Sequence, residues 1–280
     1  MSLLSIGNPK TMKGQKKGYL TGVLHLLPHK YSGYGNVCPN ATPGCSSTCL
    51  AFAGRGAMTR TQTARRQKNW LFKYDRLLFM SDLYEDISAL VRKAWRENLT
   101  PVVRLNGTSD IPWETTKMGG GFGPASIISL FPDVQFYDYT KSPKRMMASL
   151  LGRSPGEDWP ENYHLTFSRS EKNAADCQAV LGAKGTVAVV FDHLPEIGKD
   201  WTVQLSNIAG DWPVYSGEED DLRFKEKGGV IALKAKGLAK KDKSGFVLKA
   251  EKCFWLRWEP IKKAKGRYEV VETINLGGAL

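Results

Sequence analysis

Short apolar runs typical of β-strands alternate with helical segments along this chain, and this alternation constrains the fold more than any other feature. Six such runs are centred near residues 20, 103, 136, 165, 189 and 231. Such alternation favours parallel strands with helices packed on their faces. We therefore predict an α/β protein whose parallel strands form a partial or full (β/α) barrel. In such folds the chemistry lies at the carboxyl ends of the strands.

The chain divides into three predicted parts. Residues 1–17 are polar and basic and predict a flexible arm, and residues 18–224 predict the barrel-like catalytic domain, with a cysteine-rich loop at 30–56 after the first strand. Residues 225–280 predict a basic, strand-rich extension packed on the barrel. No apolar run is long enough to cross a bilayer, and no secretory signal begins the chain. We expect an intracellular protein with no membrane partner.

Positive charge is concentrated near the C-terminus. The chain has 40 Lys and Arg against 28 Asp and Glu, and residues 225–267 alone hold 14 cations and 4 anions. Aromatic residues such as Phe246 and Trp255 lie between these cations, a combination that suits a phosphate backbone with stacked bases. The alternative is a solvated charged face whose aromatic residues belong to the core. The residues predicted to contact nucleic acid are Lys234, Lys236, Lys240, Lys241, Lys243 and Arg257. A second basic cluster, at residues 60–68 of a predicted helix, favours a solvated helix face.

Cys38, Cys45 and Cys49 lie within twelve residues of the predicted loop, with the spacing C-x6-C-x3-C. An odd total of five cysteines argues against a disulfide framework, and thiolates suit zinc or an iron–sulfur cluster. Three cysteines without a local fourth ligand favour a [4Fe–4S] cluster with one open iron, which could bind S-adenosylmethionine. Zinc would need a fourth ligand from elsewhere. Incidental thiols are the remaining alternative. The candidates for that fourth ligand include His25, His29, Cys177 and Cys253.

Polar side chains follow four successive predicted strands. Asp110 and Asp192 are a candidate acid–base or nucleophilic pair, and the planar guanidinium of Arg169 could bind two oxygens of a carboxylate or phosphate. Many of these residue types also form turns and helix caps by themselves. The residues predicted to bind a small-molecule cofactor are Asn106, Ser109, Asp138, Lys141, Ser168 and Glu171.

Seven motifs carry a resemblance to a known family. In chain order they are NVCPNATPGCSSTCLAFAGRG, RLNGTSD, FYDYTK, NYHLTFSRSE, VAVVF, DLRF and ALKAKG. Together they resemble the bacteriophage gene product 88 family over residues 16–250, which implies a phage-encoded protein working in the cytoplasm of a bacterial host.

More distantly, the chain is similar to the radical S-adenosylmethionine enzymes. Those enzymes have a partial (β/α)6 barrel with an iron–sulfur cluster in the loop after the first strand, usually at the spacing C-x3-C-x2-C. This resemblance implies that the three loop cysteines ligate the cluster. It also implies a cofactor site lined by Asn106, Ser109, Asp110, Ser168 and Arg169.

Three functions are therefore predicted. The first is an iron–sulfur, radical-S-adenosylmethionine-like enzyme that modifies nucleic acid, with DNA bases favoured as the target. The second is a barrel transglycosylase that exchanges a DNA or RNA base, similar to the deazaguanine type, with structural zinc and with Asp110 and Asp192 as catalytic acids. The third is a non-enzymatic DNA-binding phage protein with a structural metal.

Overall fold

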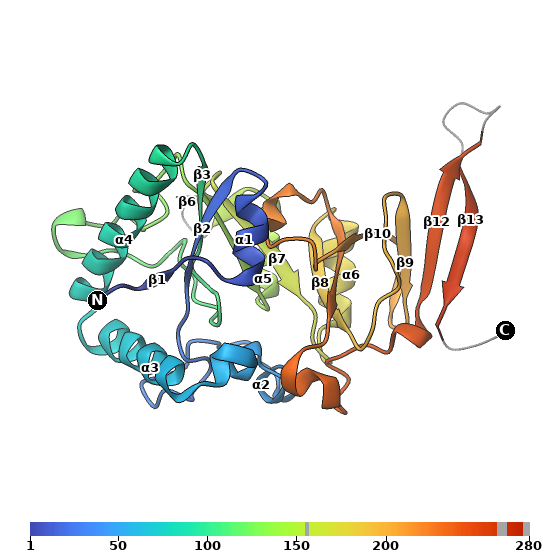
Figure 1. The fold of residues 1–280 in the computed structure, drawn as a ribbon, viewed down its shortest axis with the longest axis horizontal. Helices are drawn as coiled ribbons and strands as arrows, with labels where there is room; N and C mark the ends of the chain where they lie inside the picture. Colours follow the sequence, from blue (N-terminus) through green and yellow to red (C-terminus); the bar gives the residue numbers. More distant parts are fainter. Residues whose placement is uncertain (155–156, 262–267, 277–280) are drawn as a thin grey trace. The chain divides into compact units, whose positions relative to one another are not determined.

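The computed structural model describes residues 1–154, 157–261 and 268–276, and its chain forms two compact units. Unit 1 comprises Met1–Ala41, Cys49–Thr166 and Glu219–Phe224. Unit 2 comprises Thr42–Thr48, Phe167–Glu218 and Lys225–Leu280. Figure 1 shows the helices and strands of both units.

Unit 1 combines a sheet with four α-helices. Its strands are β1 (Leu4–Ser5), β2 (Tyr19–Leu24), β3 (Thr100–Arg104), β4 (Gln135–Thr140), β5 (Arg153–Ser154), β6 (Glu157–Asp158) and the first four residues of β7 (Tyr163–Ser168). Its α-helices are α1 (Pro9–Gln15), α3 (Thr59–Tyr74), α4 (Arg76–Arg96) and α5 (Pro143–Leu150). Its 3-10 helices are η1 (Leu50–Phe52), η2 (Gly54–Ala57), η3 (Gly120–Phe122) and the start of η4 (Arg223–Lys225).

The main sheet of unit 1 has the strand order β1-β2-β3-β4-β7. β2, β3 and β4 are parallel, with Gly22 opposite Val103 and Val102 opposite Gln135, so their carboxyl ends share one edge. β1 pairs antiparallel with β2. Gly22 lies close to α4, because an added Cβ would come within 3.0 Å of Leu90. Buried Tyr137 and Leu222 belong to a second apolar cluster.

Unit 2 carries the remaining strands and two α-helices. Its strands are β8 (Thr186–Phe191), β9 (Trp201–Leu205), β10 (Ile208–Ser216), β11 (Gly229–Lys234), β12 (Phe254–Pro260) and β13 (Tyr268–Asn275), together with the end of β7. Its helices are α2 (Pro43–Ser47), α6 (Ala174–Gly182), η5 (Gly237–Lys241) and η6 (Ala250–Lys252). The strand order is β7-β8-β11-β10-β9-β12-β13, parallel from β7 to β10 and antiparallel beyond.

The structure confirms a mixed α/β fold in which parallel strands predominate, and all six predicted strands are present as β2, β3, β4, β7, β8 and β11. The strand order within each unit is linear in the residues described, so a closed barrel is not confirmed. The basic segment 1–17, predicted as a flexible arm, contains β1 and α1. The tail predicted to be strand-rich contains β12 and β13, and four of its fourteen Lys and Arg fall in 262–267, outside the described residues. None of the described helices has the length and apolar character that a bilayer crossing requires.

Candidate functional site

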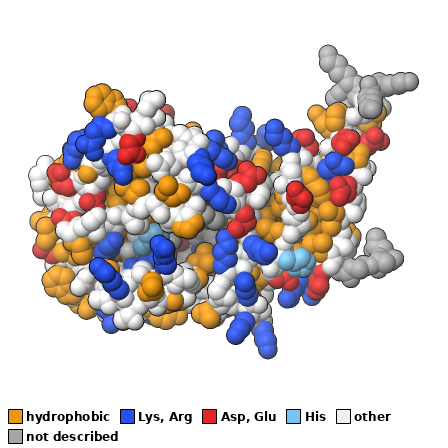
Figure 2. Space-filling model, in the orientation of Figure 1, with side chains coloured by type: hydrophobic (Ala, Val, Ile, Leu, Met, Phe, Trp, Pro, Cys, Tyr) orange, Lys and Arg blue, Asp and Glu red, His pale blue; other side chains and the backbone are white. Residues whose placement is uncertain are grey.

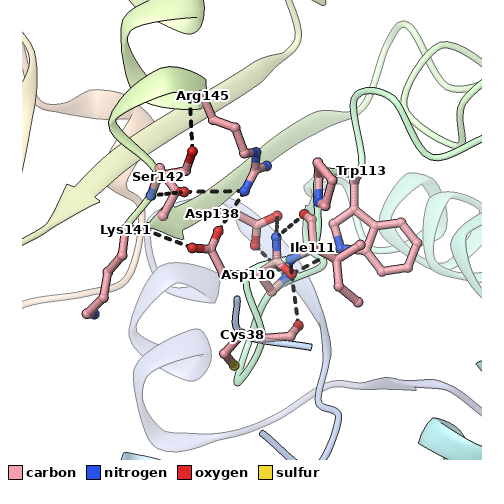
Figure 3. Close-up of polar contacts among 12 residues, drawn as sticks. Cys38, Asp110, Ile111, Trp113, Asp138, Lys141, Ser142 and Arg145 are labelled. Atoms are coloured by element: carbon pink, nitrogen blue, oxygen red, sulfur yellow. Dashed lines mark hydrogen bonds and ion pairs between the residues drawn. The ribbon is translucent and has the colours of Figure 1, made fainter. Parts of the chain in front are cut away.

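A network of acidic and basic side chains lies beyond the carboxyl ends of β3 and β4 (Figure 3). β3 is followed by Asn106 and Gly107, and β4 by Ser142 and Pro143, which begin α5. Ser142 is the N-cap, and its hydroxyl accepts from the backbone N–H of Arg145 at 3.3 Å. A proline in the first turn suits this geometry, because its missing N–H would have no partner there. The cap therefore fixes Arg145 in the first turn of α5.

Arg145 connects two acidic residues of the loop that follows β3. Its guanidinium donates two parallel hydrogen bonds to Glu114, at 2.7 and 2.8 Å, and a third to Asp110 at 2.6 Å. The side chains of Arg145, Asp110 and Glu114 are all nearly buried. Bidentate pairing of this kind combines strength with a fixed orientation. The pair with Arg145 therefore holds the Asp110 carboxylate directed toward α5.

Asp138, at the end of β4, has no exposed surface. Its carboxylate accepts hydrogen bonds from the backbone N–H of Asn106 at 2.6 Å, from the Asn106 amide at 3.2 Å and from the Tyr163 hydroxyl at 2.9 Å. Burial raises the pKa of Asp138 to about 7, although the Asn106 N–H, Arg104 and Tyr163 oppose the shift. Removing a carboxylate from water disfavours its charged form, which explains the direction.

Asn106 organises the loop that carries Asp110. Its side-chain oxygen accepts from Ser109 Oγ at 2.8 Å, from the Ile111 N–H at 2.9 Å and from Trp113 Nε1 at 3.2 Å. Its amide donates to the Ile111 carbonyl at 2.9 Å. These contacts show that Asn106 and Ser109, both predicted to bind a cofactor, have hydrogen bonds within the loop itself.

Asp110 also joins the loop to two neighbouring segments. The backbone N–H of Lys141 donates to Asp110 at 2.9 Å, while the Lys141 side chain points away from the network in Figure 3. The Asp110 N–H donates to the Val37 carbonyl at 2.8 Å. Cys38, the next residue, has its sulfur 3.7 Å from the Thr108 carbonyl oxygen. The start of the cysteine loop is therefore anchored beside Asp110.

Arg169 and Asp192, the other two predicted catalytic residues, belong to unit 2, where they hold loop backbone. Arg169 donates to the carbonyls of Gly245 and Phe246 at 3.0 and 2.9 Å. Asp192 accepts from the N–H groups of His193 and Ala250 at 2.9 and 3.0 Å. It also forms an ion pair with Lys249 at 3.2 Å.

Glu171 and Ser168, predicted to bind a cofactor, are also in unit 2. Glu171 accepts from the Thr42 hydroxyl at 2.8 Å and from the Gly44 N–H at 2.9 Å, at the start of α2. The Ser168 carbonyl accepts from the Asn173 amide at 3.2 Å. A carboxylate near the first N–H groups of a helix satisfies donors that have no intrahelical partner. Glu171 therefore holds the short helix on which Cys45 lies.

Five of the six predicted nucleic-acid contacts are exposed lysines in and around η5: Lys234, Lys236, Lys240, Lys241 and Lys243. Lys236 pairs with Glu218 at 2.6 Å. The sixth, Arg257, pairs with Glu259 at 3.3 Å and with Glu272 at 3.1 Å. Figure 2 shows Lys and Arg side chains projecting from unit 2 in the region of η5. The exposed lysines therefore form the more accessible part of the predicted surface.

The three loop cysteines are half-buried thiols. Cys38 accepts from the His29 N–H at 3.3 Å in unit 1, and Cys45 packs against the apolar cluster of Ala235 and Phe246 in unit 2. Thiol chemistry suits a soft metal. However, the described part of the chain contains no group of three or more His, Cys, Asp or Glu side chains placed to hold a metal ion. The iron–sulfur cluster, the zinc and the S-adenosylmethionine site therefore stay predictions.

Three members of the network were not predicted from the sequence as site residues: Arg145, Glu114 and Tyr163. Arg145 had a usable signal, because a cation in the first turn of a helix opposes the helix dipole and therefore needs an acidic partner. Glu114 lies in the same polar loop as Asp110, four residues later. Tyr163 begins an apolar strand and gave no signal of its own.

Comparison with known proteins identifies a family and no individual relative. No curated protein matches the chain, and no solved structure does. The sequence profile of the gene product 88 family matches residues 2–250, which include both the cysteine loop and the Asp110 network. The chain therefore belongs to the gene product 88 family of bacteriophage proteins.

Proposed function

We propose that this protein is an enzyme that exchanges or modifies a base of nucleic acid, with Asp110 as the carboxylate that meets the substrate. The observation that carries the proposal is that Arg145 and Tyr163 connect Asp110 and Asp138, two carboxyl groups of one network in different surroundings. They lie at the carboxyl edge of parallel strands, where α/β proteins place their reactive groups.

The two carboxyl groups have different surroundings. Asp110 is paired with the Arg145 guanidinium at 2.6 Å. Asp138, with its pKa raised by burial to about 7, is protonated in a large fraction of molecules. Enzymes that break glycosidic bonds commonly use carboxyl groups whose surroundings differ. The ion-paired Asp110 is therefore the candidate for the reacting carboxylate in base exchange, the second function predicted from the sequence.

Exposure separates the roles of the two residues. Asp110 keeps 8 % of its surface exposed and Asp138 keeps none. We therefore assign Asp110 as the catalytic nucleophile and Asp138 as a positioning residue, which holds Asn106 and through it the loop. In the proposed step a carboxylate oxygen of Asp110 bonds to the sugar carbon while the bond from that carbon to the base breaks. The leaving base keeps the electron pair and takes a proton from water, and an incoming base reverses the step.

Nucleic acid is the proposed substrate because of the charge distribution. Five exposed lysines in and around η5 provide a surface for phosphates, and the whole chain is strongly basic. Lysine contacts with phosphate supply affinity without sequence preference. A phage-encoded enzyme of this kind would work on DNA or RNA in the host cytoplasm.

Release of a labelled base tests the proposal. Purified protein is incubated with DNA or RNA that carries tritiated guanine, together with free deazaguanine bases, and the released label is measured. We expect release by the wild-type protein, none by Asp110→Asn, and wild-type release by Asp133→Asn, whose carboxylate is exposed before β4. Asp110→Glu keeps the charge facing Arg145 and controls for folding. Equal release by wild type and Asp110→Asn, or no release from either nucleic acid, would overturn the proposal.

A second candidate is the iron–sulfur, radical-S-adenosylmethionine-like enzyme. One observation favours it: Cys38 lies against the loop that carries Asp110, with its sulfur 3.7 Å from the Thr108 carbonyl oxygen. Cys38, Cys45 and Cys49 would be the ligands. Metal analysis of anaerobically purified protein separates the two candidates. Iron that is lost in Cys45→Ala supports the cluster. Protein without iron, or with iron retained in Cys45→Ala, excludes this assignment.

A further inference from the structure

Two cations of α3 turn away from the solvated face of that helix. α3 contains five Lys and Arg and no Asp or Glu. Arg60, Arg66 and Lys73 are exposed, whereas Arg65 and Lys68, three residues apart, are half-buried. Residues at this spacing share one face of a helix. α3 therefore presents Arg65 and Lys68 to the interior of unit 1.

Neither buried cation has a carboxylate in contact with it among the described residues. Arg65 donates to the Ala51 carbonyl at 2.8 Å, and Lys68 donates to the Leu3 carbonyl at 2.6 Å. Asp86 is the nearest source of negative charge for Lys68, but its carboxylate accepts from the N–H groups of Leu3 and Leu4 at 2.5 and 2.8 Å. Carbonyl oxygens do not neutralise a cation, so burial lowers the pKa of both Arg65 and Lys68.

His25 follows β2 and lies in the field of these cations. Its Nδ1 is 3.3 Å from Ser5 Oγ, and that hydroxyl itself donates to the Val23 carbonyl at 3.0 Å. Burial, followed by the charges of Arg65, Arg104 and Lys68, lowers the pKa of His25 to about 3. Its imidazole is therefore neutral. Arg104 adds to the field, but its own charge is matched by Asp221 at 2.8 Å.

The backbone at the carboxyl ends of β2 and β3 closes in on His25. The Gly107 N–H donates to the Leu24 carbonyl at 3.0 Å, and a Cβ at Gly107 would come within 2.9 Å of the His25 ring. A positive site at this edge of a parallel sheet is where anionic ligands bind in many α/β proteins.

We propose that Arg65, Lys68 and His25 form a binding site for the phosphate group of a nucleotide. Arg65 would bind two phosphate oxygens with its planar guanidinium, Lys68 would supply the second positive charge, and the neutral ring of His25 would line the site beside them. Bound phosphate would replace the missing negative charge in unit 1. The site does not depend on the proposed base exchange, because its residues are separate from the Asp110 network.

Titration calorimetry with inorganic phosphate, and then with a nucleoside monophosphate, tests the site in the full-length protein. A charge-assisted hydrogen bond contributes about 1.5–3 kcal/mol, so each of Arg65→Gln and Lys68→Gln should weaken binding about tenfold or more. Lys73→Gln, on the exposed face of α3, should bind as wild type. Phosphate should also raise the melting temperature of wild type and of Lys73→Gln, but not of Arg65→Gln.

The nucleotide arm identifies the source of the phosphate. Tighter binding of the monophosphate than of inorganic phosphate supports a nucleotide as the ligand. Equally tight binding of an oligonucleotide that lacks a terminal phosphate would show instead that the site binds the backbone of a nucleic-acid strand. No saturable phosphate binding, or equal weakening by Lys73→Gln, would overturn the site. Ligand-free melting temperatures identify any variant that fails to fold.

Discussion

Polar side chains follow the parallel strands in both units, yet they do different work. In unit 1, Asp110 and Asp138 contact other side chains, and Arg145 and Tyr163 link them. In unit 2, Arg169 contacts the loop carbonyl of Gly245, and Asp192 contacts the Ala250 N–H and the side chain of Lys249 at the loop surface. The same residue types at corresponding strand ends therefore have different roles. In unit 1 they form a network that can hold and move charge, and in unit 2 they fix loops. Only the first arrangement is typical of a reactive site.

The two regions also respond to pH in opposite directions. Burial raises the pKa of Asp138 in unit 1, so its contribution to stability is full at low pH and is lost as the pH rises toward 7. Hydrogen bonds from Gly44 and Thr42 lower the pKa of Glu171 in unit 2, although partial burial opposes them. The contribution of Glu171 is therefore present at neutral pH and is lost as the pH falls.

The largest expected effect comes from Arg145→Met. This change leaves two nearly buried carboxylates, Asp110 and Glu114, without their cation. Loss of one partner of a buried ion pair costs about 3–5 kcal/mol, and two acidic partners place this variant at the upper end. Arg169→Met, the matched change in unit 2, removes two hydrogen bonds to carbonyls and should cost about 2 kcal/mol. Urea denaturation measures the free energy of unfolding of both variants. Equal losses would contradict the difference inferred between the polar residues of unit 1 and those of unit 2.

Asp138→Asn tests the sign of the pH dependence. A shift of the Asp138 pKa to about 7 makes the free energy of unfolding fall with rising pH, by about 4 kcal/mol at most. The asparagine variant should lose this fall between roughly pH 4 and 7, because it has no proton to exchange. Glu161→Gln, at an exposed acidic residue before β7, is the control. An unchanged pH profile in Asp138→Asn would mean that Asp138 is ionised throughout this range.

The sequence predicted more of the fold than of the site. The six parallel strands were predictable because each is a short apolar run, and all of them except β3 are buried along most of their length. The β9–β10 hairpin was not predictable, since Trp201–Leu205 and Ile208–Ser216 mix apolar, polar and proline residues. The pairing of the two strands also contains a register shift. For the site, Asn106, Asp110 and Asp138 were predictable from their positions after strands. Their partners were not, because burial of an arginine depends on contacts between distant segments that no local pattern encodes.

Substitution of the exposed lysines of unit 2 tests whether that region binds nucleic acid. Replacing Lys240, Lys241 and Lys243 with glutamine should weaken DNA binding and reduce the slope of log affinity against log salt by about 3, if each lysine contacts one phosphate. Arg257→Gln should have little effect, because Arg257 already pairs with Glu259 and Glu272. Filter binding at several salt concentrations measures the slope. A slope that is unchanged in the triple variant would place the nucleic-acid surface elsewhere.

The smallest expected effect, from Glu171→Gln, bears most directly on the contrast in pH response. The Glu171 carboxylate accepts from Thr42 and from the Gly44 N–H at 2.8 and 2.9 Å, where it serves as an external cap of α2. Glutamine keeps one acceptor but loses the charge, so the expected loss at neutral pH is about 1 kcal/mol. That loss should shrink below roughly pH 4, where the wild-type carboxylate is itself protonated. Hydrogen exchange at the amides of α2 measures the local effect, and Glu251→Gln, exposed in η6, is the control. A loss of stability that persists at low pH would show that the shape of the Glu171 side chain, and not its charge, stabilises α2. The opposite pH responses of the two units would then rest on Asp138 alone.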